Sequence, residues 1–249
     1  MKHMTRCFKF IATLATVMLF FGGKAYAQPT ATDKFLFEEM LKLASKGEPE
    51  AEYHIGMFFN NGIGTAADPD EAFQWFKKSA AAGDPLGAYK LGCYYAGQFA
   101  GVVDIDQNIA LKYKLVAAEQ GYDLAQSDVA RHYHVSKNYP EAIRWLTEAA
   151  KQGDPGSMYR LSALYAQGQI VPTDLVKSYL YLDAMRHLPE ISSDQQIADA
   201  FAMLTKSMSE TELAAAKKNQ PLAIEPSALT LKARDGLTQA KFYLAANMQ

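Results

Sequence analysis

The stretch AEYHIGMFFNNGIGTAADPDEAFQWFKKSAAAG, residues 51–83, sets a pattern that recurs along the chain. Its first half places a small residue, an apolar residue, a second small residue and an aromatic residue at fixed steps. Four copies carry these columns: Ala51, Ile55, Gly56, Phe59; Gly87, Leu91, Gly92, Tyr95; Ala125, Val129, Ala130, Tyr133; and Ser157, Leu161, Ser162, Tyr165. A second set follows the first three copies: Ala72, Trp75, Ala80, Gly83; Ala110, Tyr113, Ala118, Gly121; and Ala142, Trp145, Ala150, Gly153. The alanine that opens each second set stands 15 residues before the next copy, and this constant register indicates a tandem repeat.

Each repeat is predicted to form two antiparallel helices. The first helices are expected near residues 50–60, 85–97, 123–135 and 155–167, and the second near 69–82, 107–120, 139–152 and 174–188. Small residues in the first helix should let its partner approach closely. Side-chain oxygens that can cap the second helices are found at Asp68, Asp106, Asn138 and Asp174. The pattern therefore predicts an all-α protein built as a stack of helix pairs.

Residues 1–27 are typical of a secretory signal peptide. Lys2, Arg6 and Lys9 precede an apolar run from Phe10 to Phe21, and Ala25-Tyr26-Ala27 provides a cleavage signal. The alternative is a retained N-terminal anchor. Cleavage would remove 27 of 249 residues and four positive charges, so that the net charge changes from −2 to −6. An acidic chain of this kind is a poor candidate for nucleic-acid binding, and we expect no membrane span after cleavage.

Flanking segments complete the predicted domain organisation. Residues 28–48 should form an N-terminal capping helix, and residues 49–189 four helical repeats. Residues 190–220 should form C-terminal capping helices, the second of them opened by a capping box that starts at Ser209. Residues 221–249 are expected to form a linker and a tail helix that is broken around Gly236.

The repeat columns of residues 50–189 resemble the Sel1-like repeats (SLR), which are relatives of the tetratricopeptide repeats. The first repeat matches most closely, through Ala51, Gly56, Gly62, Gly64, Asp68, Ala72, Trp75, Ala80 and Gly83. The resemblance implies a right-handed α-solenoid, an SLR/TPR-like superhelix that acts as a non-enzymatic adaptor for other proteins, often in the bacterial envelope. Cysteine-rich members resemble penicillin-binding or β-lactamase proteins and carry a disulfide in each repeat. This chain departs from them, because Cys93 is the only cysteine after residue 27 and no S-x-x-K is present.

The first helices of stacked pairs line the concave side of a solenoid, which is the predicted partner-binding surface. Side chains not used in packing between the two helices of a pair should point into it. The candidates are Tyr53, Met57, Asn60, Tyr89, Cys93, Arg131, His134 and Tyr159. Tyrosine and arginine are favoured where a protein partner anchors. The alternative is that the tyrosines pack between adjacent repeats.

No residue pattern points to catalysis, a cofactor or a metal. His132 and His134 lie two residues apart, about 200° around a helix, and so cannot share one metal ion. Cys93 stands in no recognisable nucleophile motif. We therefore expect a periplasmic or secreted scaffold whose partner is a protein or peptide. Two alternatives remain: a module that binds peptidoglycan or hydrolyses a β-lactam, and a secreted, host-directed virulence factor.

Overall fold

The computed structural model describes residues 30–247, so the predicted signal peptide lies outside the described residues. Within this range the chain forms helices, turns and loops, without a strand. The helices are α1 (Ala31–Ala44), α2 (Pro49–Asn61), α3 (Pro69–Ala81), α4 (Pro85–Tyr95), α5 (Gln107–Glu119), α6 (Asp123–Val135), α7 (Tyr139–Lys151), α8 (Pro155–Gln167), α9 (Leu175–Arg186), α10 (Gln195–Ser207), α11 (Glu210–Lys218), α12 (Ala228–Asp235) and α13 (Leu237–Asn247). The prediction of an all-α fold is confirmed.

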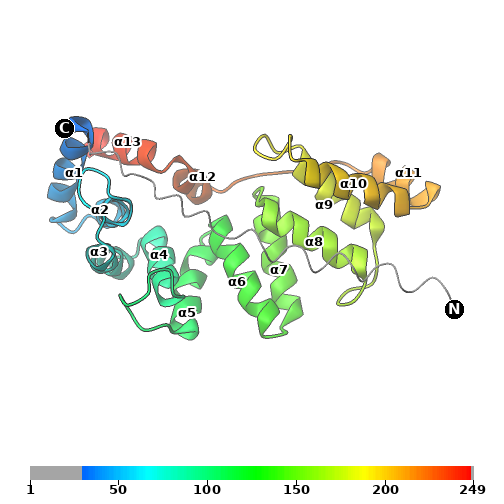
Figure 1. Ribbon diagram of the computed structural model, residues 1–249, viewed down its shortest axis with the longest axis horizontal. Coiled ribbons are helices and arrows are strands. Elements are labelled where there is room, and N and C mark those ends of the chain that lie inside the picture. The colour runs from blue at the N-terminus through cyan, green and yellow to red at the C-terminus, as the bar shows by residue number, and fades with distance from the viewer. Residues whose placement is uncertain (1–29, 248–249) are drawn as a thin grey trace.

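The four predicted helix pairs are α2–α3, α4–α5, α6–α7 and α8–α9, and each pair packs against the next to form an α-solenoid (Figure 1). The carboxylates of Asp68, Asp106 and Asp174 accept backbone N–H groups at the start of α3, α5 and α9, as predicted. Asn138 was predicted to do the same for α7, and this is wrong. Its backbone has φ −82° and ψ 72°, and its side chain makes no capping hydrogen bond.

Small residues in the first helices allow the close approach that the repeat columns predicted. A Cβ atom added to Gly56 would lie 2.6 Å from the Phe76 ring, inside the contact distance of two carbons. At Gly92 it would lie 2.9 Å from both the Ala110 carbonyl oxygen and Cγ of Lys114. In the fourth repeat serine replaces glycine, and the hydroxyls of Ser162 and Ser178 form a buried hydrogen bond of 2.9 Å. The small residues at these three positions therefore leave room for close contact with the second helix of the pair.

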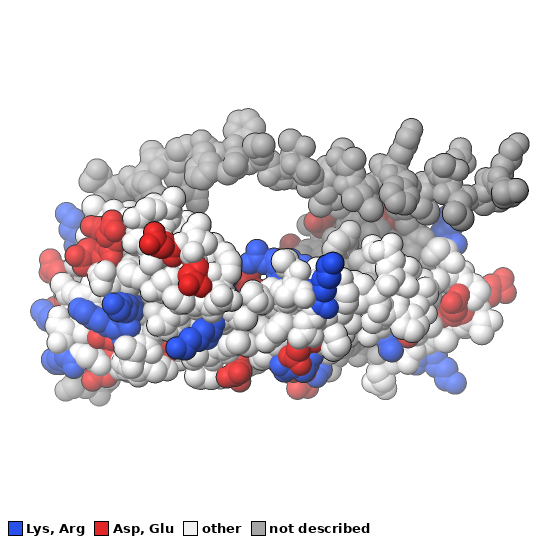
Figure 2. Space-filling view, turned by 90° about the horizontal axis from the view of Figure 1, so that it is seen from below, with Lys and Arg blue, Asp and Glu red and all other residues white. Residues whose placement is uncertain are grey.

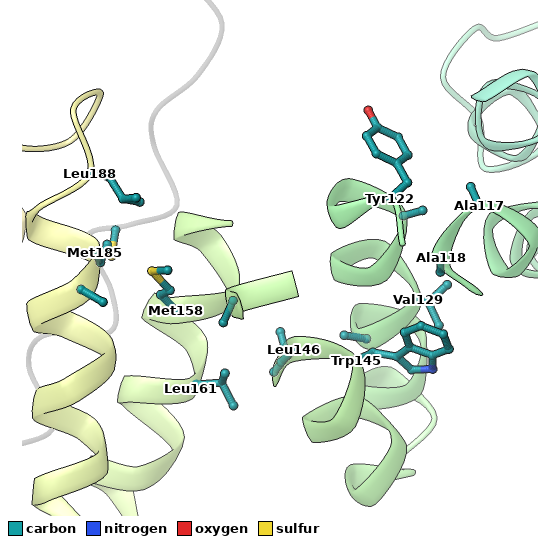
Figure 3. Packing of buried hydrophobic residues seen from close by; sticks show 14 of the residues in the cluster. Ala117, Ala118, Tyr122, Val129, Trp145, Leu146, Met158, Leu161, Met185 and Leu188 are labelled. Atoms are coloured by element: carbon teal, nitrogen blue, oxygen red, sulfur yellow. The ribbon is translucent and has the colours of Figure 1, made fainter. Parts of the chain in front are cut away.

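One apolar core runs through the repeats and a second holds the N-terminal end. Figure 3 shows part of the first core, where Leu146 of α7 points toward Leu161 of α8 and Trp145 of α7 lies beside Val129 of α6. The second core joins α1 and α2 to α13 and contains Met40 and Ala240, both fully buried. Burying side chains from neighbouring elements stabilises a stack that isolated helix pairs could not maintain.

The segment after α11 runs back along the solenoid toward its start. Residues 219–227 have no helix, and α12 and α13 then lead toward α1, next to the helices that begin the chain (Figure 1). Gly236, with φ +49°, separates the two helices. The first and last described parts of the chain are therefore in contact.

Candidate partner-binding groove

Three hollows follow one another along the first helices of repeats two to four. One lies between α6 and α8 over α7, the second between α5 and α6, and the third between α4 and the start of α6. Arg131 lines both the first and the second, and Lys114 lines both the second and the third. Neighbouring hollows therefore adjoin one another across three repeats, and we call this row of hollows the groove.

The hollow between α6 and α8 has an apolar floor and a cationic rim. Ala130, Leu146 and Leu164 lie among its lining residues, and Leu146 is buried in the core. Arg131 and Arg160 line the same hollow and are exposed. Its volume of about 280 Å³ lies at the lower limit of about 300 Å³ for small-molecule pockets. The dimensions and chemistry suit an apolar side chain of a partner that has a carboxylate beside it.

Lys114, Asp128 and Arg131 form a charged chain along the groove. The Asp128 carboxylate lies 2.5 Å from Nζ of Lys114 and 2.8 Å from a guanidinium nitrogen of Arg131. The Lys114 side chain is 9% exposed and that of Arg131 is 60% exposed. The buried lysine therefore neutralises Asp128, and the arginine keeps most of its surface for a ligand.

Positive charge is concentrated in the groove. The residues that line the three hollows include four Lys or Arg (Lys90, Lys114, Arg131, Arg160) and one acid, Asp128. The complete chain has a net charge of −2. Figure 2 shows Lys and Arg interspersed with Asp and Glu on one face of the molecule. This local excess favours an acidic ligand.

Tyr89 and Cys93 lie together in the third hollow, but both are largely committed to packing. The Tyr89 ring meets the Tyr122 ring edge-on, with centroids 4.9 Å apart, which joins the second repeat to the third. Burial raises the pKa of the Cys93 thiol, although nearby Lys114 opposes the shift. The thiol is therefore protonated at neutral pH, unlike a cysteine poised as a nucleophile.

Three of the predicted groove residues lie outside these hollows. Tyr53 is 7% exposed and packs against Phe76 of α3, so its ring is used in packing within the first helix pair. Met57 is half-buried against the same core. The Asn60 side-chain oxygen accepts a 3.0 Å hydrogen bond from the Tyr94 hydroxyl. The first repeat thus uses its inward-facing residues for packing.

Arg131, His134 and Tyr159 are brought together in the hollow between α6 and α8. Tyr159 is 45% exposed, an unusual value for a large ring inside a repeat stack. Arg160 and Gln167 also line this hollow and were missed by the sequence analysis. Arg160 directly follows the Tyr159 column, and its position becomes apparent only through its 3.1 Å hydrogen bond to the Ser127 hydroxyl on α6.

Two further findings concern residues 30–247. None of the helices in this range has the length and apolar character needed to cross a membrane. Within the same range, no three side chains of the metal-binding types His, Cys, Asp and Glu converge.

Comparison with known proteins agrees with the repeat architecture. The Sel1 repeat matches four segments, residues 49–84, 85–122, 125–154 and 155–184, which together are more than half of the chain. This chain belongs to the Sel1 repeat family. The Sel1 matches begin close to α2, α4, α6 and α8, so each covers one helix pair of the solenoid.

Curated relatives of this Sel1 repeat protein are longer than the matched region. A sel1-like repeat-containing protein, L21, of Acanthamoeba polyphaga mimivirus is 30% identical over 127 residues, which are 50% of this chain and 23% of the viral protein. Protein NMB1327 of Neisseria meningitidis serogroup B is 30% identical over 138 residues, 53% of this chain and 28% of the relative. The matched region therefore spans about a quarter of these relatives.

The solved structures include a Sel1 repeat protein from Oxalobacter formigenes. It is similar with a TM-score of 0.57 and 23% identity, over 71% of this chain and 80% of that chain. This likeness supports the solenoid fold. Sel1 repeats mediate protein–protein interactions, and proteins of the family are generally non-enzymatic scaffolds.

Proposed function

We propose that this Sel1 repeat protein is a non-enzymatic adaptor that binds an acidic segment of a protein partner in the groove of repeats two to four. The hollow between α6 and α8 carries the proposal. It combines an apolar floor at Leu146 with Arg131 and Arg160 at the rim and the half-exposed ring of Tyr159. An apolar side chain in the hollow, followed by Asp or Glu against the arginines, would use both features.

The groove chemistry also defines how the partner would be held. Arg131 already contacts Asp128, but its guanidinium has five N–H donors and can serve a second carboxylate. Arg160 extends the cationic rim onto the next repeat. A partner segment that contacts both arginines would therefore have to span two adjacent repeats.

Selection from a random peptide library on the full-length protein tests this function. We expect enriched peptides to combine Leu, Met or Phe with neighbouring Asp or Glu, and to bind Arg131→Ala about tenfold more weakly, as loss of one charged hydrogen bond implies. Arg144→Ala is the matched control, because Arg144 makes a similar i,i+3 ion pair with Glu141 at 2.7 Å and has a side chain 52% exposed. Peptides without acidic residues, or equal loss of binding in both variants, would contradict the proposal.

The cellular location follows from the N-terminal sequence, and we propose that the protein acts in the envelope or outside the cell. The apolar run Phe10–Phe21 and the Ala25-Tyr26-Ala27 signal support export. Fractionation of cells that express a C-terminally tagged protein should recover a product shortened by 27 residues in the periplasm or the medium. A full-length product in the cytoplasm would contradict it.

A further inference from the structure

The turns that join successive repeats share one backbone geometry, but the tail covers only two of them. Gly47, Gly83, Gly121 and Gly153 all have positive φ, between +84° and +93°. A Cβ atom added to Gly47 or Gly83 would meet nothing within 4 Å. One added to Gly121 would lie 3.2 Å from Ser227, and one added to Gly153 would lie 3.0 Å from Ile224. Residues 224–227 of the tail therefore lie directly over the second and third of the turns inside the repeat array.

Polar contacts between the tail and these two turns are specific. The Ser227 hydroxyl donates to the Gly121 carbonyl at 2.7 Å, and the Ser227 N–H donates to Oε1 of Gln152 at 3.0 Å. The Thr230 hydroxyl donates to the same Gln152 oxygen at 2.7 Å and accepts the Asp123 N–H at 3.1 Å. Thr230 is completely buried by this arrangement.

The Gln152 side chain links the tail to the interior of the repeats. Its amide nitrogen donates to the Gln126 side-chain oxygen at 2.8 Å, and Gln126 in turn donates to the Ala118 carbonyl at 3.1 Å. Both glutamines are buried. Because an unpaired buried amide is costly, a segment that offers hydroxyl and N–H donors fits this position and an apolar segment does not.

Charge pairs fix the register of α12 on the turns. Arg234 contacts the Asp123 carboxylate at 2.6 Å and also donates to the Gln152 carbonyl at 3.1 Å. Two residues toward its N-terminus, Lys232 pairs with Glu50 of the first repeat at 2.7 Å. The tail thus contacts repeats one and three through two positive side chains that lie two residues apart.

The helical form of α12 depends on this docking. It has eight residues, whereas an isolated helix in water needs about 12–15 residues to be even marginally stable. Ser227 caps it by accepting the Thr230 N–H at 3.1 Å while bonded to the Gly121 turn. Ser227 therefore both caps α12 and attaches it to the Gly121 turn.

We propose that the turns around Gly121 and Gln152, together with Asp123 and Glu50, form a binding site for a short helix that begins Ser-x-x-Thr and carries basic residues on its next turn. Residues 224–235 of the chain occupy this site in cis. Through α13, which packs on α1, the bound tail ties the third and fourth repeats to the N-terminal end of the solenoid.

The docked tail also borders the partner groove. Ala233 and Arg234 line a hollow of about 210 Å³ together with Tyr122 and Leu124. The same Tyr122 and Leu124 line the hollow that contains Tyr89 and Cys93. Release of the tail would remove one wall of this neighbouring hollow.

Hydrogen exchange on the full-length protein tests the site. Asn tolerates positive φ, so Gly121→Asn and Gly83→Asn place equal strain on equivalent turns, but only the first puts a side chain beneath the tail. We expect about tenfold faster exchange across residues 228–235 in Gly121→Asn, as loss of one or two hydrogen bonds implies, and no change there in Gly83→Asn. Equal exchange of the tail in the two variants would overturn the proposal.

A peptide of residues 221–247 then tests recognition in trans. Arg234→Glu should release the tail by repelling Asp123 while keeping the turns intact, so the labelled peptide should bind this variant and raise its fluorescence polarisation. The wild-type protein, whose site is filled, and Arg234→Glu with Gly121→Asn, whose site is blocked, should not bind it. Circular dichroism should show all these proteins folded. A released tail with no peptide binding to Arg234→Glu would reject a specific site.

Discussion

The repeats and the tail helix α12 are both helical, but different forces hold them, whereas α13 shares an apolar core with α1 and α2. Within the repeats, neighbours pack through fully buried apolar residues such as Phe76, Tyr94 and Leu161. The helix α12 has one buried residue, Thr230, and is held mainly through hydrogen bonds and charge pairs to residues more than 70 positions earlier. Apolar burial therefore builds the scaffold, whereas polar contacts position an element on its edge.

This difference determines how far a perturbation should spread. Each repeat shares its core with two neighbours, so that loss of core packing weakens the stack as a whole. The tail contacts two turns and one end of the stack, and most of its surface is exposed. Its loss should change the tail and its sites while the repeats remain folded.

The largest effect is expected from the core of the repeats. Phe76 is completely buried, lies under Gly56 and packs against Tyr53 and Tyr94. Phe76→Ala should lower the free energy of unfolding by about 3–5 kcal/mol, since it removes a buried ring and leaves a cavity. Urea unfolding followed by circular dichroism measures this change.

The control for Phe76 lies in the tail. Phe242 on α13 is 66% exposed, so Phe242→Ala should change the free energy of unfolding by less than about 0.5 kcal/mol. Similar losses in the two variants would contradict the division between an apolar scaffold and an exposed tail.

Alanine substitution of two helical glycines should have smaller effects on the free energy of unfolding, and the effects should differ between Gly92 and Gly156. Gly92→Ala forces a methyl group against the Ala110 carbonyl and Lys114, so it should destabilise the protein by about 1–3 kcal/mol. Gly156 on α8 has its nearest neighbour at 3.5 Å, an ordinary contact. Gly156→Ala should therefore be neutral or stabilise by up to about 1 kcal/mol through helix propensity. Thermal unfolding of the Gly92→Ala and Gly156→Ala variants measures whether the fold needs glycine only where two helices approach closely.

The contrast between the repeats and the tail also explains which parts of the structure could be predicted from the sequence. The helices of the repeats were predicted within a few residues because small and aromatic residues recur in register, and Gly56 and Gly92 occupy the close contacts that the columns implied. The docking of the tail could not be predicted. Thr230 and Gln152 are separated by 78 residues, and a single Ser-x-x-Thr leaves no periodic signal.

The groove lies between these two cases. Column spacing led to Arg131, His134 and Tyr159, which do lie in one hollow. It also placed Tyr53 on the binding surface, although that ring is buried against Phe76. Spacing identifies the side of a helix, but whether a side chain is covered depends on the size of the side chains that pack against it.

The smallest expected effect concerns the charge pair between tail and first repeat. Burial alone would raise the pKa of Glu50, but His54 at 3.6 Å and Lys232 at 2.7 Å prevail and hold it below its ordinary value of 4.5. A carboxyl with a lowered pKa stabilises the folded form above the unfolded-state pKa, and this contribution is lost as the pH falls through the folded-state pKa. The part of tail docking that depends on Lys232 should therefore disappear in acid.

Comparison of the wild-type protein with Lys232→Met isolates this contribution from the other groups that face Glu50, which are His54, Tyr53, Asp84 and Tyr243. Burial raises the pKa of Asp84, so protonation of that residue alone would act in the opposite direction. Lys232 nevertheless favours the ionised form of both carboxyls.

The difference between the two proteins in hydrogen-exchange protection of the tail should be below about 1 kcal/mol near neutral pH and should shrink as the pH falls below the ordinary pKa value of 4.5. Lys241→Met, which removes an exposed charge on α13, should leave tail protection unchanged at every pH. A difference for Lys232→Met that persists in acid would mean that the lysine holds the tail by packing rather than by charge.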